Sequence, residues 1–274
     1  MTHSPDDLRH VLWLGGPPGS GKTTVALRLA RRHGLRVYSA DTRTWEHRDR
    51  ALRDGNAAAA RFEATPPAER VLLPPEELFA LSLHQERGPM VVDDVTRLPR
   101  SPLVIAEGSV VPAEVFRTGL ADAGRALWLM PTASFQQRRL AERDANPGAA
   151  ALYAVAARAI AREVAAAGAP RLDLDGSLDL DLDATVAAVE RHFAVALAAG
   201  PRAATTERRA LLREANLDVV RQVRGFHARP WASGDPERVV RAFACECGDS
   251  SCAATVDATV AEAAAGPLRA PRHR

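Results

Sequence analysis

The sequence of 274 residues has very little lysine: of its 36 basic side chains only Lys22 is a lysine, and the others are arginines. Alanine and arginine are abundant while isoleucine and asparagine are scarce, a composition typical of GC-rich genomes in which arginine replaces lysine. A lysine that persists against this bias indicates a position that requires a compact ammonium group, which a broad, planar guanidinium does not imitate. Lys22 is therefore the first candidate functional residue.

Cysteine and long apolar runs are also scarce. The three cysteines, Cys245, Cys247 and Cys252, are an odd number and lie too close together in sequence for a disulfide framework. No uncharged apolar run approaches the roughly 18 residues of a membrane span. The polar start of the chain, Met1–Arg9, lacks the basic-then-apolar order of a secretory signal. We therefore expect a cytoplasmic protein with no membrane partner.

The chain has almost no net charge, +2 at neutral pH. Because nucleic-acid-binding domains usually carry a strong basic surplus, nucleic acid is not an expected partner. The hydrophobic content of 46% and the charged content of 26% are those of a folded globular protein. The length suits one large domain, or a medium-sized domain with a small second one.

Short apolar runs alternate with helical stretches over the first two-thirds of the chain, which predicts an α/β fold with a parallel sheet. We expect strands over residues 10–15, 35–40, 103–106, 125–130 and 171–175, and helices over residues 22–33, 76–86, 135–143, 149–167 and 183–199. The composition changes after Gly200-Pro201. We therefore expect a domain over residues 1–200 and a small module with the cysteines over residues 205–274.

The segment Gly16–Thr23 (GPPGSGKT) fits the phosphate-loop pattern G-x-x-x-x-G-K-[ST] in full, with an apolar strand before it and a helix after it. Glycines let the backbone turn its N–H groups toward phosphate oxygens, and the following helix adds its positive end. Lys22 would reach the β- and γ-phosphates, and the Thr23 hydroxyl would bind Mg²⁺. The expected ATP-binding residues are Gly16, Gly19, Ser20, Gly21, Lys22, Thr23 and Thr24.

A carboxylate follows the second predicted strand. Asp41 could accept a proton from an attacking hydroxyl or hold that hydroxyl in line; the alternative is a helix N-cap, a position that favours Asp. The charged stretch that follows contains His47 and Arg48, which could bind a polar substrate, although a solvated helix face is the favoured interpretation.

Two segments compete to supply a carboxylate near Mg²⁺. Residues 90–94 end in Asp93 and Asp94, and residues 103–106 are followed by Glu107. The eight residues between them are too few for a crossover between parallel strands, so only one segment belongs to the sheet. The spacing of residues 90–98 also fits a helix, and we therefore favour Glu107.

The first 200 residues resemble the P-loop small-molecule kinases, such as shikimate kinase, gluconate kinase and chloramphenicol phosphotransferase. The resemblance rests on Gly16–Thr23, on Asp41, and on Arg139-x-x-x-Arg143 followed by Pro147. It implies a five-stranded parallel sheet in the order 2-3-1-4-5, with ATP at the loop and the acceptor across the carboxyl ends of the strands. It also implies that Asp41 contacts the acceptor.

The same resemblance implies a lid over ATP in the helix after the fourth strand. Arg138 would then bind the nucleotide, and Arg139 and Arg143 would be catalytic, neutralising charge on the transferred phosphoryl group. The alternative, in a chain so rich in arginine, is a solvated helix face.

The three cysteines form a C-x-C-x₄-C pattern. Cysteine thiolates in such clusters bind Zn²⁺, and the fourth ligand here would be His227, His273 or water. Buried free thiols and a strained redox pair are the alternatives.

These observations favour an ATP- and Mg²⁺-dependent kinase, a phosphotransferase that moves the γ-phosphate to a hydroxyl of a small molecule of antibiotic, sugar or cofactor-precursor type. A second hypothesis is an ATP-binding switch whose C-terminal, zinc-binding module contacts a partner. A third, a zinc-dependent nucleic-acid-binding protein with an accessory NTPase, agrees poorly with the low net charge.

Overall fold

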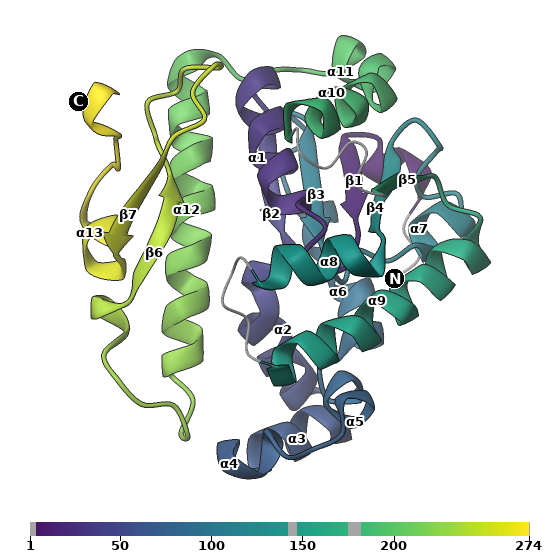
Figure 1. Ribbon diagram of the computed structural model, residues 1–274. Helices are drawn as coiled ribbons and strands as arrows, with labels where there is room; N and C mark the ends of the chain where they lie inside the picture. Colours follow the sequence, from purple (N-terminus) through teal and green to yellow (C-terminus); the bar gives the residue numbers. More distant parts are fainter. Residues whose placement is uncertain (1–3, 142–146, 175–181, 274) are drawn as a thin grey trace.

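The computed structural model describes residues 4–141, 147–174 and 182–273. Its centre is a five-stranded parallel sheet in the order β2-β3-β1-β4-β5 (Figure 1). The strands are β1 (Val11–Gly15), β2 (Arg36–Ser39), β3 (Val104–Gly108), β4 (Ala126–Pro131) and β5 (Arg171–Leu174). The predicted α/β class and strand order are therefore confirmed.

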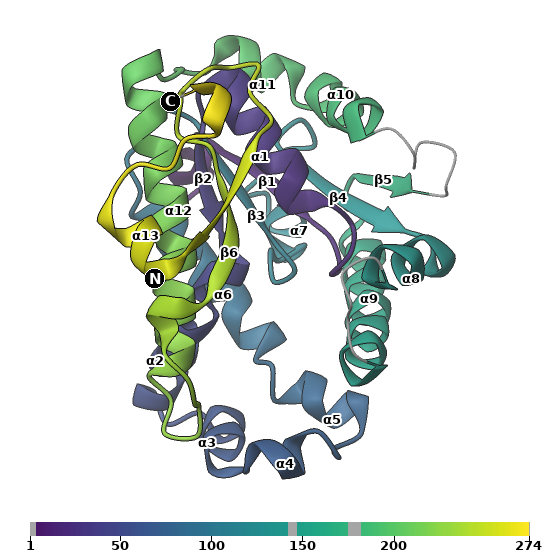
Figure 2. The ribbon, with the colours of Figure 1, turned by 60° about the vertical axis from the view of Figure 1, so that its left-hand side comes forward.

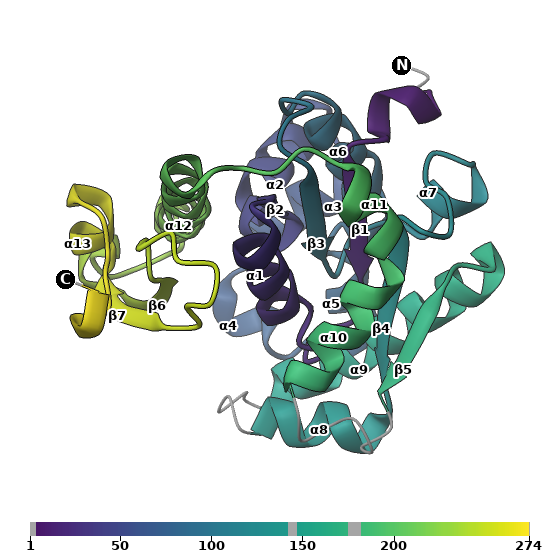
Figure 3. The same cartoon turned by 90° about the horizontal axis from the view of Figure 1, so that it is seen from above.

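Helices cover both faces of this sheet (Figure 3) because successive side chains of a buried strand point to opposite faces. In β1, Val11 and Trp13 face one set of helices, whereas Leu12 and Leu14 face the other. The helices of the first face are α6 (His84–Thr96), α7 (Glu114–Arg117) and α9 (Pro147–Ala167). Those of the second are α1 (Lys22–His33), α8 (Ala133–Ala141), α10 (Leu182–His192) and α11 (Ala194–Ala199).

Between β2 and α6 the chain forms a row of short helices that extends beyond the sheet (Figure 2). They are the 3-10 helix η2 (Ala40–Arg43), α2 (Thr44–Arg53), α3 (Ala57–Ala64), α4 (Pro67–Arg70) and α5 (Pro75–Ala80). At its far end α5 packs against α9. The row therefore lies beside the carboxyl ends of the strands, where the phosphate loop also begins.

Two predicted helices are wrong in their extent. Residues 76–86 do not form one helix, because Leu83 adopts a left-handed conformation (φ +63°) between α5 and α6 and is fully buried with Ala51 and Ala59. Residues 183–199 divide at Phe193, another fully buried side chain. In both places a side chain packed into the core decides the backbone, against local helix propensity.

The C-terminal residues form a second, smaller unit against the edge of the sheet at β2 (Figures 1 and 3). The long helix α12 (Thr205–His227) packs on the antiparallel pair β6 (Val240–Ala244) and β7 (Thr255–Thr259), followed by α13 (Val260–Ala265) and the 3-10 helix η4 (Pro271–His273). Two further 3-10 turns are η1 (Pro5–Leu8) and η3 (Pro236–Arg238). Within the described ranges no helix has both the length and the apolar character of a membrane span.

Candidate active site and candidate metal centre

The phosphate loop joins β1 to α1 and has a backbone that only glycine adopts without strain. Gly16, Gly19 and Gly21 have φ angles of +143°, +86° and +81°. A Cβ atom on Gly16 would lie 2.5 Å from the carbonyl oxygen of Leu129 on the neighbouring strand. The loop is therefore drawn tightly against β4, and α1 begins directly after Gly21.

Two features of the loop fit a bound phosphate chain. The first N–H groups of an α-helix have no partner within the helix and attract anions. The buried hydroxyl Oγ of Ser20 also has no hydrogen-bond partner among the described residues, and a buried polar atom usually requires one. Phosphate oxygens would satisfy both sets of donors, so the loop residues, Thr24 included, fit a nucleoside triphosphate.

Lys22 and Asp41 meet above the loop. The Nζ of Lys22 lies 3.5 Å from Oδ2 of Asp41, and the lysine side chain is 6% exposed. Asp41 also accepts hydrogen bonds from the backbone N–H of Ser109 (3.1 Å) and from its hydroxyl (3.4 Å). Asp41 lies inside η2, whose N-cap is Ser39, so the N-cap alternative for Asp41 is wrong.

Neighbouring charges keep Asp41 ionised. Burial opposes ionisation, but the positive charges of Lys22 and Arg87, with the Ser109 N–H, hold the pKa of Asp41 below its usual value. A carboxylate in this state at neutral pH can accept a hydrogen bond from a hydroxyl group.

Glu107 lies at the carboxyl end of β3, beside Ser39 in the register of the sheet. The carboxylate is fully buried and accepts hydrogen bonds from the hydroxyls of Thr23 (Oγ1–Oε2 3.0 Å) and Ser39. Burial and the nearby charge of Asp41 raise the pKa of Glu107. Thr23 and Glu107 offer only oxygen atoms, the donors that Mg²⁺ prefers.

The competing carboxylates lie elsewhere. Residues 90–94 are part of α6, as their spacing predicted, and the strand is β3. Both Asp93 and Asp94 pair with Arg50 on α2, at distances of 3.1 and 2.7 Å. The structure thus places Glu107, and neither aspartate, beside Thr23.

A cleft of about 680 Å³ opens next to Lys22, Thr23 and Asp41. Its lining includes hydroxyl groups from Thr44, Ser82 and Ser109. It also includes apolar and aromatic side chains from α5, α8, α9 and the loop after β3: Phe79, Val110, Leu140, Leu152, Tyr153 and Ala156. The phosphate loop and Asp41 therefore border a space large enough for a small molecule.

Two residues of the predicted lid helix, Gln136 and Leu140, contact the phosphate loop or line the cleft. Gln136 of α8 donates a hydrogen bond from Nε2 to the carbonyl oxygen of Pro18 (2.8 Å), and Leu140 lines the cleft. Among the described residues that line the cleft, neither Arg138 nor Arg139 occurs; Arg138 is exposed and lies over the Phe135 ring. Arg143 lies outside the described residues.

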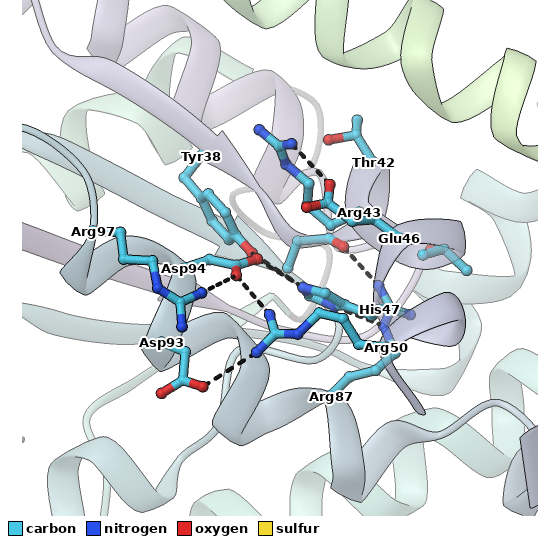
Figure 4. A network of polar contacts seen from close by, with 12 residues as sticks. Tyr38, Thr42, Arg43, Glu46, His47, Arg50, Arg87, Asp93, Asp94 and Arg97 are labelled. Carbon is cyan, nitrogen blue, oxygen red and sulfur yellow. Dashed lines mark hydrogen bonds and ion pairs between the residues drawn. The ribbon is translucent and has the colours of Figure 1, made fainter. Parts of the chain in front are cut away.

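A polar network beneath the cleft joins α2 to α6 (Figure 4). Oδ2 of Asp94 accepts hydrogen bonds from the Tyr38 hydroxyl (2.7 Å) and from Nε2 of His47 (2.8 Å). Arg87 donates to Nδ1 of His47 (3.3 Å) and to the carbonyl oxygen of Ala40 (2.6 Å). Because Ala40 precedes Asp41, the network fixes the backbone that carries the candidate base.

The favoured interpretation of the 44–50 stretch as a solvated helix face is wrong for two residues. His47 is fully buried in this network, and Arg48 is 2% exposed. The guanidinium of Arg48 lies 3.8 Å from the centre of the Phe62 ring and donates to the Leu81 carbonyl oxygen (2.8 Å). Both side chains support the fold here, and neither lines the cleft among its described residues.

We predict that Asp94→Asn lowers the free energy of unfolding by about 3 kcal/mol at pH 7, because it removes the negative charge that faces Arg50, Tyr38 and His47 in a partly buried network. Hydrogen bonds from His47 and Tyr38 and the charge of Arg50 lower the pKa of Asp94 despite its burial. The folded state therefore binds this proton less readily than the unfolded state. The deficit should be complete above about pH 5 and shrink as the pH falls through the folded-state pKa.

Urea denaturation of both proteins across this pH range measures the effect. Asp93→Asn is the matched control, because its side chain is 35% exposed, and we expect a loss of at most about 1 kcal/mol. Equal losses in the two variants, or a deficit that grows toward acid pH, would contradict the role given to Asp94.

Sequence reasoning did not identify three residues that shape this site: Arg87, Ser109 and Gln136. Each contacts the site from a distant part of the chain, so no local pattern marks it. Ser109 is the exception, because it directly follows β3, the strand that carries Glu107 and lies next to the strand that precedes Asp41.

The cysteines form a second cluster, on the C-terminal unit. The Sγ atoms of Cys245, Cys247 and Cys252 and one ring nitrogen of His273 all lie within 4.8 Å of one another. His273 was one of the predicted fourth ligands; His227, at the end of α12, is not in the group. Four side chains that could hold a metal ion are therefore brought together.

Hydrogen bonds favour the thiolate form of one cysteine. Burial would raise the pKa of Cys245, but the Ala270 N–H, His273 and Cys247 lower it to about 6. Burial raises the pKa of Cys247. All three cysteines are free of disulfide bonds.

No protein-family model matches this chain, and no curated protein matches it. Among solved structures, the crystal structure of TT1252 from Thermus thermophilus is similar, with 23% sequence identity and a TM-score of 0.39. The similarity covers 66% of this chain and 96% of TT1252. It assigns neither a family nor an activity, so the chemistry of the site rests on its own geometry.

Proposed function

We propose that this protein is an ATP-dependent phosphotransferase that moves the γ-phosphate of ATP to a hydroxyl group of a small molecule. The observation that carries the proposal is the position of Asp41, 3.5 Å from Lys22 and on the border of the cleft. An ionised carboxylate at this point of the cleft can align a hydroxyl group of a bound small molecule with the phosphates held by the loop.

Each residue then has a chemical task. The loop from Gly16 to Thr24 binds the triphosphate, and Lys22 neutralises charge on the β- and γ-phosphates. Thr23 and Glu107 would hold Mg²⁺, which would offset the negative charge of the phosphates. Asp41 accepts a hydrogen bond from the acceptor hydroxyl, aligns its oxygen and takes up its proton.

The cleft suggests the kind of acceptor. The hydroxyl groups of its lining suit a ligand with several hydroxyl groups, and the apolar and aromatic side chains of its lining suit an apolar body. Molecules of antibiotic, sugar or cofactor-precursor type combine these features. Selection among them would lie with Phe79, Ser82 and Tyr153.

The test is incubation with γ-labelled ATP, Mg²⁺ and pools of small hydroxylated metabolites and antibiotics, followed by separation of labelled products. We expect one pool to give a labelled small molecule and subdivision to isolate the acceptor. Label that passes only to water, across broad pools and at saturating ATP, would contradict the proposal.

One observation favours a second candidate, an ATP-dependent switch. Arg43, two residues after Asp41, pairs with Asp218 on α12 (2.8 Å), and Arg229, two residues after the end of α12, pairs with Asp49 on α2 (2.7 Å). A shift of η2 on ATP binding would therefore act on the C-terminal unit. Hydrogen exchange in α12 that changes with ATP, without transfer to any acceptor, would favour this candidate.

The Cys₃His cluster takes no part in the proposed transfer. We propose that this cluster binds a zinc ion, for reasons that do not depend on the transfer.

A further inference from the structure

We propose that Cys245, Cys247, Cys252 and His273 bind one zinc ion, and that this ion fastens the end of the chain to the phosphate-loop helix α1. The proposal is independent of the proposed phosphotransfer, because none of the four residues lines the cleft among its described residues.

The spacing of the four ligand atoms fits a tetrahedral ion. Nδ1 of His273 lies 3.4 Å from Sγ of Cys245 and 3.5 Å from Sγ of Cys252. Zn–S bonds of about 2.3 Å and Zn–N bonds of about 2.0 Å at tetrahedral angles place sulfur and nitrogen about 3.5 Å apart. An ion could therefore enter with little rearrangement of the side chains.

The type of ligand identifies the metal. Three thiolates with one imidazole suit zinc, whereas Mg²⁺ and Ca²⁺ prefer oxygen. Because the protein supplies all four ligands, no position remains for water or substrate. Such a closed site stabilises a fold and does not catalyse.

The surroundings of the cluster are organised to hold thiolates. Cys245 and Cys252 are buried, at 0% and 4% exposure. The backbone N–H of Ala270 donates to Sγ of Cys245 (3.3 Å), and that of Ala254 donates to Sγ of Cys252 (3.4 Å). Such hydrogen bonds in the second layer orient metal ligands and favour their charged form.

The ligands come from separate parts of the C-terminal unit. Cys245 directly follows β6, Cys247 and Cys252 lie in the connection to β7, and His273 belongs to η4 near the end of the chain. One bound ion would therefore close a loop from residue 245 to residue 273. Without the metal, η4 lacks the bond between His273 and the ion, so fewer contacts hold η4 in place.

Arg31 links this cluster to α1. Its guanidinium, in the last turn of that helix and 4% exposed, donates to the carbonyl oxygen of Cys245 (2.7 Å) and to Sγ of Cys247 (3.7 Å). A zinc ion bound by three thiolates and one neutral imidazole forms a centre of net charge −1. The positive charge of Arg31 would offset that charge, so metal binding and the contact with α1 reinforce each other.

The first test uses the full chain, purified without chelators from cells supplied with zinc. We expect elemental analysis to find one zinc per chain. Cobalt(II) added to the metal-free protein should produce sulfur-to-cobalt charge-transfer absorption and intense tetrahedral d–d bands. Absence of zinc together with absence of the charge-transfer band in the wild-type protein would overturn the proposal, without any variant that could fail to fold.

Variants then assign the ligands by competition with a coloured zinc chelator. His273→Ala should weaken zinc binding at least about tenfold, His273→Cys should restore most of it, and His227→Ala is the matched control that should not change it. Wild-type affinity in both His273→Ala and Cys252→Ser would show adventitious binding and would overturn the assignment.

A second pair of variants tests the link to α1. Arg31→Gln should weaken zinc binding about tenfold, because the charge that offsets the centre is lost. Arg32→Gln, one residue further along the helix, removes a charge whose partners are Asp183 and Glu190 and should leave zinc affinity unchanged. Equal effects of the two substitutions would refute the part given to Arg31.

Discussion

Replacement of Lys22 by arginine should abolish phosphoryl transfer, although the substitution keeps the positive charge. Lys22 is 6% exposed and lies between a tightly turned loop and Asp41. A guanidinium is wider and planar, and it cannot occupy the position of a compact ammonium without displacing either the loop or the Asp41 side chain. Loss of a donor aimed at the transferred group costs about 10²–10³-fold in rate, and a distorted loop should also weaken ATP binding.

The measurement is the rate of ATP turnover and the affinity for ATP in Lys22→Arg and Lys22→Ala. Arg28→Lys, the reverse exchange at a partly exposed position of the same helix, is the matched control and should keep full activity. Thermal denaturation identifies any variant that fails to fold. If Lys22→Arg retained wild-type turnover, the significance given to the single lysine would be wrong.

Replacement of Asp41 by asparagine should separate binding from transfer. The amide keeps the size of the side chain but cannot take a proton from the acceptor, and loss of a general base costs about 10²–10⁴-fold in rate. Lys22 and the loop remain, so the affinity for ATP should be almost unchanged. The expected result is a fall in kcat with labelled acceptor, at a nearly constant dissociation constant for ATP.

The control for Asp41→Asn is Asp54→Asn, at the exposed end of α2. A parallel loss of ATP affinity in Asp41→Asn would indicate that Asp41 only positions Lys22, since the two side chains pair directly. An unchanged transfer rate would exclude Asp41 as the base and would require another acceptor for the proton.

The elements with local signals could be predicted from the sequence. Helix α1 has its expected bounds, because an apolar repeat begins after the loop glycines and Gly34 ends the helix with a left-handed conformation. The choice of Glu107 over Asp93 and Asp94 followed from the short connection between the two segments, which allows only one strand, and from the helical spacing of residues 90–98. In each case the deciding information lies within a few residues of the feature.

The rest of the site depends on contacts between distant residues. Arg87 reaches Ala40 across 47 positions of sequence, and Gln136 reaches Pro18 across 118. His47 and Arg48 are buried because α6 and Phe62 cover them. The sequence of a charged stretch does not indicate which of its side chains a distant element will bury. For the same reason, the abundance of arginine concealed which arginines belong to the site.

The position of α12 has a consequence for the protein in solution. Strand β2 lies at the border of the sheet, and among the described strands it pairs only with β3, so its outer side offers unsatisfied backbone groups to a strand of another molecule. Helix α12 packs along β2, and Glu214 on that helix pairs with Arg36 on the strand. The C-terminal unit therefore protects this edge of the sheet against pairing with a strand of another molecule. A shortened chain ending near residue 200 would lose this protection.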